Sequence, residues 1–372
     1  MVYPKSFIVK LVMLGFISLL LSCTDDVEPQ PAVSDVSWQP AGLETHSIFD
    51  LVVADGVLTA ATEEKVYQIP ISDTQSDEIK WNNLELNIEH NFRRINSIVK
   101  EDPENIMAAL ILGDIEEIEE GTPSLYITDD GGSSWSPVHS EKESSKDFTQ
   151  VRIVEAQEPK NPSLEAIYGE YRGGIVGSTD QGQTWQMLYK DYALFIQVSP
   201  HHPEKIWIGA HVEGFAPSLG KSEDGGASWT PLFHEIQDAV SGAATAQAAL
   251  LHPVDPQIAL VGLTSSGTSN NKAVLSQDGG ETFETVLEEA GIRTMAHGIE
   301  SEERVYASGQ HITGKPFVAI SPDFGINWET FVYEDAEIED RVFAREMVVV
   351  NRNGQEVVYL ATNKGVFQAE VH

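Results

Sequence analysis

A short motif recurs five times in this chain and constrains its fold more than any other feature. Each copy has the form Ser/Thr-x-Asp-x-Gly-x-Ser/Thr/Asn-Trp/Phe, and the copies begin at residues 128, 178, 222, 276 and 321. A repeat period of roughly 48 residues is typical of architectures in which each repeat is one supersecondary unit stacked on its neighbours. The sequence therefore predicts a repeat protein.

Each copy of the motif lies where a hairpin turn is expected, because strand-like residues precede it and an aromatic residue follows it. An Asp side chain can hydrogen-bond backbone amides of the turn, and Gly accepts a positive φ. One catalytic or metal centre would not need five identical copies. We therefore expect a structural role for the motif carboxylates, which are Asp130, Asp180, Asp224, Asp278 and Asp323.

The motif resembles the Asp-box, or BNR repeat, of sialidase-like β-propellers. The size of the chain, its repeat and its N-terminal segment also resemble the photosystem-assembly-factor branch of that superfamily. The resemblance implies all-β blades of four antiparallel strands. Two further units lack the motif but share its strand pattern, at residues 51–62 and 347–362, and they bring the number of units to seven.

The last unit ends after three strands, near Ala369. The segment Trp38-Gln39-Pro40 matches the phrase that follows other copies of the motif, such as Trp135-Ser136-Pro137. We therefore predict that residues 36–43 supply the missing fourth strand and that Trp38 pairs beside Val366 and Phe367. The predicted fold is a seven-bladed β-propeller over residues 36–372, whose closure removes open sheet edges.

The N-terminus reads as a lipoprotein leader. Residues 1–22 are predicted to be a signal peptide, because Lys5 and Lys10 precede an apolar run too short to span a membrane. Cys23 is the only cysteine, and Leu20-Leu21-Ser22-Cys23 resembles a bacterial lipobox. Residues 23–35 are predicted to hold the lipidated Cys23 and an acidic tether, which resembles the export tag of surface lipoproteins. We expect a lipid anchor in the outer membrane of a Gram-negative bacterium, with the protein at the cell surface.

The strong acidity of the chain narrows its partners. It has 58 acidic and 23 basic residues and a net charge of −35. This charge argues against binding to nucleic acid or to anionic lipid surfaces other than through the anchor. The sequence shows no phosphate-binding loop, nucleophile elbow or Cys/His cluster, so we predict no cofactor and no metal site.

Strand order predicts which face binds a ligand. In a four-stranded blade the A–B and C–D turns share one face, and the B–C and D–A loops share the other. The motif forms C–D turns, so the opposite face is the expected binding face. Six of the nine arginines fall in its segments, where they suit a carboxylate, sulfate or phosphate or else pair with neighbouring acids. The predicted ligand-binding residues are Arg94, Arg172, Arg293, Arg345, His211 and His311.

These features predict a non-catalytic module that binds a protein partner or an acidic glycan. The alternative is a carbohydrate-active enzyme, either a sialidase-like glycoside hydrolase or a polysaccharide lyase. The sialidase resemblance implies an arginine trio and a Tyr nucleophile assisted by a carboxylate. Candidates for that pair are Tyr171 with Glu170 and Tyr192 with Asp191.

Overall fold

The computed structural model describes most of the chain after the predicted leader. The described ranges are residues 35–76, 78–84, 92–100, 106–112, 125–137, 148–155, 165–171, 174–178, 184–191, 193–199, 201–210, 218–240, 244–264, 271–288, 290–334 and 341–372. The predicted signal peptide and lipidation site lie outside these ranges. Within them, no helix has the length and apolar character needed to cross a bilayer.

The described strands form seven four-stranded antiparallel sheets. Six sheets use four consecutive strands, whereas the seventh combines the last three strands of the chain with the first. Two short helices accompany them in the described ranges: the 3₁₀-helix η1 (Ile71–Gln75) and the α-helix α1 (Phe233–Ala239). From innermost to outermost, the first three sheets contain β2 (Asp50–Ala54), β3 (Val57–Ala61), β4 (Val66–Pro70) and β5 (Asn82–Leu84); β6 (Phe92–Lys100), β7 (Ile106–Leu112), β8 (Leu125–Thr128) and β9 (Ser136–Pro137); and β10 (Phe148–Glu155), β11 (Glu165–Tyr171), β12 (Gly174–Ser178) and β13 (Gln186–Tyr189).

The remaining four sheets follow the same order outward from the centre. They contain β14 (Ala193–Val198), β15 (Ile206–Ala210), β16 (Ser218–Ser222) and β17 (Thr230–Pro231); β18 (Thr245–Leu251), β19 (Ala259–Thr264), β20 (Lys272–Ser276) and β21 (Glu284–Glu288); β22 (Ala290–His297), β23 (Val305–His311), β24 (Phe317–Ser321) and β25 (Glu329–Val332); and β26 (Ala344–Arg352), β27 (Gln355–Thr362), β28 (Gly365–Val371) and β1 (Val36–Pro40).

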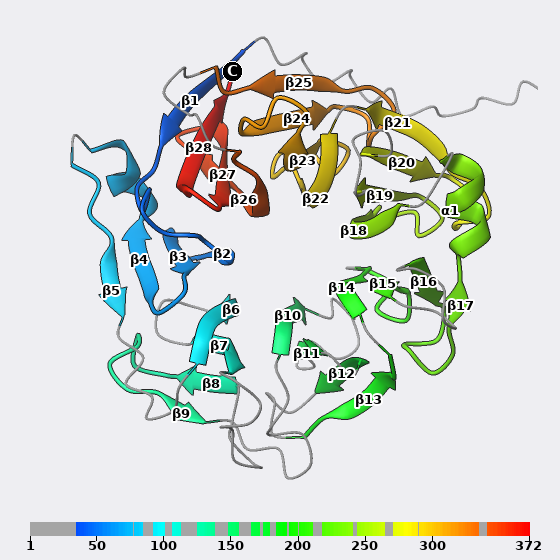
Figure 1. Cartoon of the computed structure of the whole chain (residues 1–372), viewed down its shortest axis with the longest axis horizontal. Coiled ribbons are helices and arrows are strands. Elements are labelled where there is room, and N and C mark those ends of the chain that lie inside the picture. The colour runs from blue at the N-terminus through cyan, green and yellow to red at the C-terminus, as the bar shows by residue number, and fades with distance from the viewer. Residues whose placement is uncertain are drawn as a thin grey trace, which may run out of the picture. The chain divides into compact units, whose positions relative to one another are not determined.

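The innermost strands of these sheets contact one another in a closed cycle. β2 contacts β6, and the contacts continue through β10, β14, β18, β22 and β26 back to β2. Figure 1 shows these strands around the centre and the outer strands at the rim. This arrangement is a β-propeller, as the sequence predicts.

The N-terminal strand closes the last sheet, also as predicted. β1 runs antiparallel to β28, with Trp38 opposite Ala369 and Pro40 opposite Phe367. The predicted partner Phe367 therefore pairs with Pro40, two residues after Trp38. β1 ends at Pro40 rather than at residue 43, because Gly42 and Leu43 adopt positive φ angles of 97° and 59° that turn the chain out of the sheet.

The aromatic residues of the motif pack between neighbouring sheets. Trp229, which precedes β17, meets Tyr189 of the preceding sheet edge to face, with ring centroids 5.4 Å apart. Its indole Nε1 donates to the carbonyl of Leu188 at 2.9 Å. Phe283 in the next sheet meets Trp207 in the same way, at 6.3 Å. Each of these aromatic side chains thus buries apolar area between two sheets. This burial stabilises the packing of each repeat against the next.

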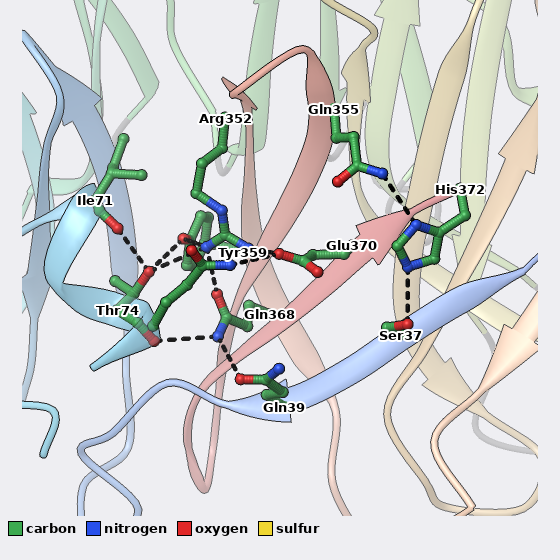
Figure 2. A network of polar contacts seen from close by, with 11 residues as sticks. Ser37, Gln39, Ile71, Thr74, Arg352, Gln355, Tyr359, Gln368, Glu370 and His372 are labelled. Carbon is green, nitrogen blue, oxygen red and sulfur yellow. Dashed lines mark hydrogen bonds and ion pairs between the residues drawn. The ribbon is translucent and has the colours of Figure 1, made fainter. Parts of the chain in front are cut away.

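A buried polar network joins the first sheet to the last where the ring closes (Figure 2). Arg352 at the end of β26 donates from Nη1 to Thr74 Oγ1 at 3.3 Å, and to Gln368 Oε1 at 3.0 Å. Its Nη2 pairs with Glu370 of β28. Thr74 belongs to η1 of the first sheet, and Gln368 also donates to Gln39 of β1 at 3.2 Å. Through Arg352 and Gln368 the network therefore links the last sheet to η1 and to β1, which are far from it in sequence.

We predict that Arg352→Met lowers the free energy of unfolding by about 3 kcal/mol, because it leaves buried hydrogen-bond acceptors and Glu370 without their cation. Chemical denaturation of the purified protein measures this change. Lys80→Met is the control, because Lys80 forms an exposed pair with Glu78 worth less than about 1 kcal/mol. Equal stability of the two variants would contradict a closing role for Arg352.

Backbone hydrogen bonds confirm which turns share a face. Motif residues in C–D turns donate to carbonyls of the A–B turn of the same sheet: Gly225 to Glu204 at 2.9 Å, and Phe324 to Glu303 at 2.7 Å. On the other side, Val342 in a D–A segment donates to Gly314 in a B–C turn at 2.8 Å. We call the A–B and C–D side the motif face, and the B–C and D–A side the loop face.

Candidate functional site

The described motif carboxylates accept hydrogen bonds on both oxygens from their own turns. Asp224 Oδ1 accepts hydrogen bonds from Ser222 Oγ at 2.9 Å and from the Ser228 backbone N–H at 2.8 Å. Its Oδ2 accepts from Ser228 Oγ at 2.6 Å. Ser222 Oγ in turn accepts from the Gly226 N–H at 2.8 Å. The same set of bonds recurs around Asp130, Asp278 and Asp323, whereas Asp180 lies outside the described residues.

These donors keep the motif carboxylates ionised. The backbone N–H of Ser134, then its hydroxyl, then that of Thr128 hold the pKa of Asp130 at about 2. A pKa depressed by folding stabilises the fold above the unfolded value of about 4, and this contribution is lost as the pH falls through about 2. Both oxygens of each described motif carboxylate accept hydrogen bonds from residues of the same turn, which is what a structural role requires. The motif is therefore a turn staple, and the site must be sought elsewhere.

We predict that Ser276→Ala lowers the free energy of unfolding by about 1–2 kcal/mol. Ser276 is buried, and its Oγ accepts from the Gly280 N–H at 2.7 Å and donates to Asp278 Oδ1 at 2.9 Å. Thermal or urea denaturation checks this value. Glu281→Ala changes an exposed residue of the same turn and should have little effect, so a similar loss in both variants would refute the staple.

A cavity of about 230 Å³ lies among the innermost strands of four consecutive sheets. It is lined by β14, β18, β22 and β26, four of the inner strands that Figure 1 shows around the centre of the ring. The charged residues among the described lining residues are Arg293, Arg345 and Glu346. We call this space the axial cavity.

A β-bulge in each lining strand supplies one wall residue of the axial cavity. The pairing register shifts at Leu194 in β14, at Gln247 in β18, at Arg293 in β22 and at Arg345 in β26. All four residues line the cavity. A bulge leaves one extra residue outside the ladder and re-aims its side chain. The bulge in each of these four strands therefore places one side chain, which differs from strand to strand, in the wall of the axial cavity.

Arg293 is the least compensated of these residues. Its Nε is buried and has no hydrogen-bond partner, and no acidic group of the described residues lies within ion-pairing distance. Its guanidinium lies 5.1 Å from the ring centroid of Phe343. Burial lowers the pKa of Arg293, although an arginine stays charged in proteins. A half-buried cation without an anion is costly, and a bound anion would remove that cost.

Arg345 and Glu346 are held more firmly than Arg293. Arg345 Nη1 donates to the carbonyl of Ile48 at 3.0 Å, and its guanidinium lies 4.5 Å from the ring centroid of Phe49 and 5.0 Å from that of Phe343. Glu346 Oε1 accepts from Thr294 Oγ1 at 2.8 Å and from the Met347 N–H at 3.0 Å. The cavity therefore has a braced cation, a braced anion and an uncompensated cation.

The structure brings two of the predicted ligand-binding residues together, Arg293 and Arg345. Arg94 lies in β6, but its side chain is outside the described part, as are Arg172 and His211. His311 ends β23, where its Nδ1 lies 2.8 Å from Thr313 Oγ1, and it is not among the described lining residues. Sequence reasoning missed Gln247, Thr294 and Glu346, because single polar residues inside a strand pattern give no signal of their own.

The side chains of three of the four candidate catalytic residues lie outside the described part of the structure, so these candidates stay a prediction. Tyr171 and Glu170 end β11, but their side chains are not described, and Tyr192 lies outside these ranges. Asp191 is an exposed turn residue before β14. In the described part of the chain, no three His, Cys, Asp or Glu side chains gather as metal ligands.

Comparisons with known proteins show the fold of the chain. No family model and no curated protein matches the sequence. A solved structure of YCF48 bound to a D1 peptide matches with a TM-score of 0.60 and 16% identity, over 92% of this chain and 99% of that one. The GH74 enzyme of Niastella koreensis matches with a TM-score of 0.60 and 14% identity, over 89% of this chain and 53% of that one.

A third match is the extracellular domain of the putative hybrid two-component system BT4673 from B. thetaiotaomicron. Its TM-score is 0.59 at 10% identity, over 90% of this chain and 39% of that chain. The chain has the β-propeller fold. At these identities the likeness extends to the fold alone, and this propeller spans about half or less of the GH74 and BT4673 chains. The function must therefore be argued from the axial cavity.

Proposed function

We propose that this protein is a lipid-anchored, extracytoplasmic β-propeller that binds an anionic group of a protein or an acidic glycan in its axial cavity. The observation that carries the proposal is the buried, unpartnered Nε of Arg293 beside a cavity of about 230 Å³. In a chain with a net charge of −35, a cation left without an acidic partner is unusual. An anionic ligand would supply the missing charge.

The surroundings of Arg293 support a binding role. Arg345 is already held by a hydrogen bond to the Ile48 carbonyl and by two aromatic rings. Its side chain therefore loses little conformational entropy when a ligand binds to it. Gln247 and Thr294 add neutral hydrogen-bonding groups to the wall. Such a combination of a few placed polar groups with fixed cations is typical of a recognition site.

Binding accounts for the described wall residues better than glycoside hydrolysis does. Most glycosidases use a pair of carboxylates, and a Tyr nucleophile assisted by a carboxylate is the exception. Among the described lining residues, Glu346 is the one carboxylate, and no Tyr accompanies it. The solved relatives include both a peptide-bound YCF48 and GH74 enzymes, so the fold itself does not favour catalysis.

The test is a binding screen of the full-length protein in detergent against acidic oligosaccharides and acidic peptides. Reducing-end detection in the same samples reports any cleavage. Saturable binding without new reducing ends supports the proposal. New reducing ends that appear with enzyme-like turnover would instead support the alternative, a carbohydrate-active enzyme.

We predict that Arg293→Met weakens binding of the anionic ligand by about tenfold or more, because it removes a charged hydrogen-bond donor from the cavity. Calorimetry or fluorescence titration measures the dissociation constant. Arg341→Met is the matched control, because Arg341 is an exposed arginine just before β26 that does not line the described cavity. Equal losses in both variants would point to a diffuse charge effect and contradict a specific site.

The membrane anchor rests on the sequence, where Cys23 follows Leu20-Leu21-Ser22. We predict that Cys23→Ser abolishes incorporation of radiolabelled palmitate and releases the protein from the membrane fraction. Protease accessibility in intact cells then tests display at the cell surface. Membrane retention of the unlabelled Cys23→Ser variant would contradict lipidation at this residue.

A further inference from the structure

We propose that Glu346 makes the axial cavity selective for groups that carry a single negative charge, such as a carboxylate or a sulfate ester, over doubly charged phosphate monoesters. The inference rests on the proposed anion-binding function and assigns Glu346 as its specificity-determining residue. An arginine can bind a carboxylate, a sulfate or a phosphate. The proposed selectivity retains the carboxylate and the sulfate ester, which carry one charge, and excludes the doubly charged phosphate.

The charge of the cavity wall carries the argument. Its charged lining residues within the described ranges are Arg293, Arg345 and Glu346, which sum to one net positive charge. A ligand group with one negative charge offsets the net charge of these three residues. A second negative charge would leave an excess in a partly desolvated space, where Coulomb repulsion is stronger than in water.

Glu346 is fixed at this position rather than free to withdraw. It directly follows the bulge at Arg345, and its Oε1 accepts hydrogen bonds from Thr294 Oγ1 at 2.8 Å and from the Met347 N–H at 3.0 Å. Thr294 belongs to β22 and directly follows Arg293. The carboxylate is therefore tied to the strand that carries the uncompensated cation, and an incoming anion meets both charges together.

Selection by charge differs from selection by shape, and one set of probes separates the two. Glucuronate, glucose 6-sulfate and glucose 6-phosphate share a hexose body and differ in the anionic group. At about pH 8 the phosphate monoester carries nearly two charges, because its second pKa is about 6. We expect glucuronate and glucose 6-sulfate to bind the full-length protein, and glucose 6-phosphate to bind about tenfold more weakly or worse.

Two manipulations should remove this discrimination. Glu346→Gln keeps an oxygen that accepts both hydrogen bonds but loses the charge, so it should bind glucose 6-phosphate at least as tightly as glucose 6-sulfate. Lowering the pH to about 5 leaves the phosphate with one charge and should strengthen its binding to the wild type. Glu329→Gln removes the same charge from an exposed position on β25 and should change neither preference. Thermal denaturation confirms that both variants are folded.

The outcomes separate the inference from the function on which it rests. Discrimination against glucose 6-phosphate that Glu346→Gln abolishes and Glu329→Gln preserves supports both. Arg293-dependent binding of all three probes with equal affinity overturns the selectivity but leaves the anion-binding function standing. No binding of any probe to the wild type or to Glu346→Gln overturns the proposed function, and the selectivity with it. A preference for glucuronate over glucose 6-sulfate would assign the ligand as a carboxylate, and the reverse would assign it as a sulfate ester.

Discussion

The pairing of β1 with β28 is the interaction on which the rest of the structure depends. It joins the first described strand of the chain to the last, and the Arg352 network adds contacts between the last sheet and η1 of the first. A ring of sheets that did not close would expose two edges and let the inner strands move apart. Because the axial cavity is built from four of those inner strands, its geometry depends on a contact at the rim of the ring.

The motif face and the inner strands of the propeller have different physical roles. On the motif face, each repeated turn satisfies its own polar groups, as Asp224 and Ser222 do for their neighbours, and this self-sufficiency makes the turns good staples. At the centre, the β-bulges break the regular ladder and leave single residues such as Arg293 to meet side chains from other sheets. The repeated turns therefore stabilise the fold, and the residues at the β-bulges form the candidate site.

Much of the fold could be predicted from the sequence because its signals are local. The spacing of the motif, the hairpin chemistry around each Asp and the unmatched Trp38-Gln39-Pro40 segment each depend on a few neighbouring residues. The site was predicted less fully. Arginine clustering predicts Arg94, Arg172, Arg293 and Arg345 as ligand-binding residues. The structure places Arg293 and Arg345 at the cavity, and the clustering gives no signal for Glu346. The predicted end of β1, at residue 43, lies three residues beyond its observed end at Pro40, because the strand pattern does not reveal the turn at Gly42 and Leu43.

The sequence by itself determined the all-β repeat, the identity of the turn face and the strand that closes the ring, since these follow from periodicity and from strand order. Only the tertiary structure decided which cations are compensated. Arg352 finds acceptors on η1, far away in the sequence, and on β28, Arg345 contacts Phe49 and the Ile48 carbonyl, and Arg293 has a buried Nε with no partner. Whether a buried charge is paired depends on groups brought together from distant parts of the sequence, and no local pattern records that proximity.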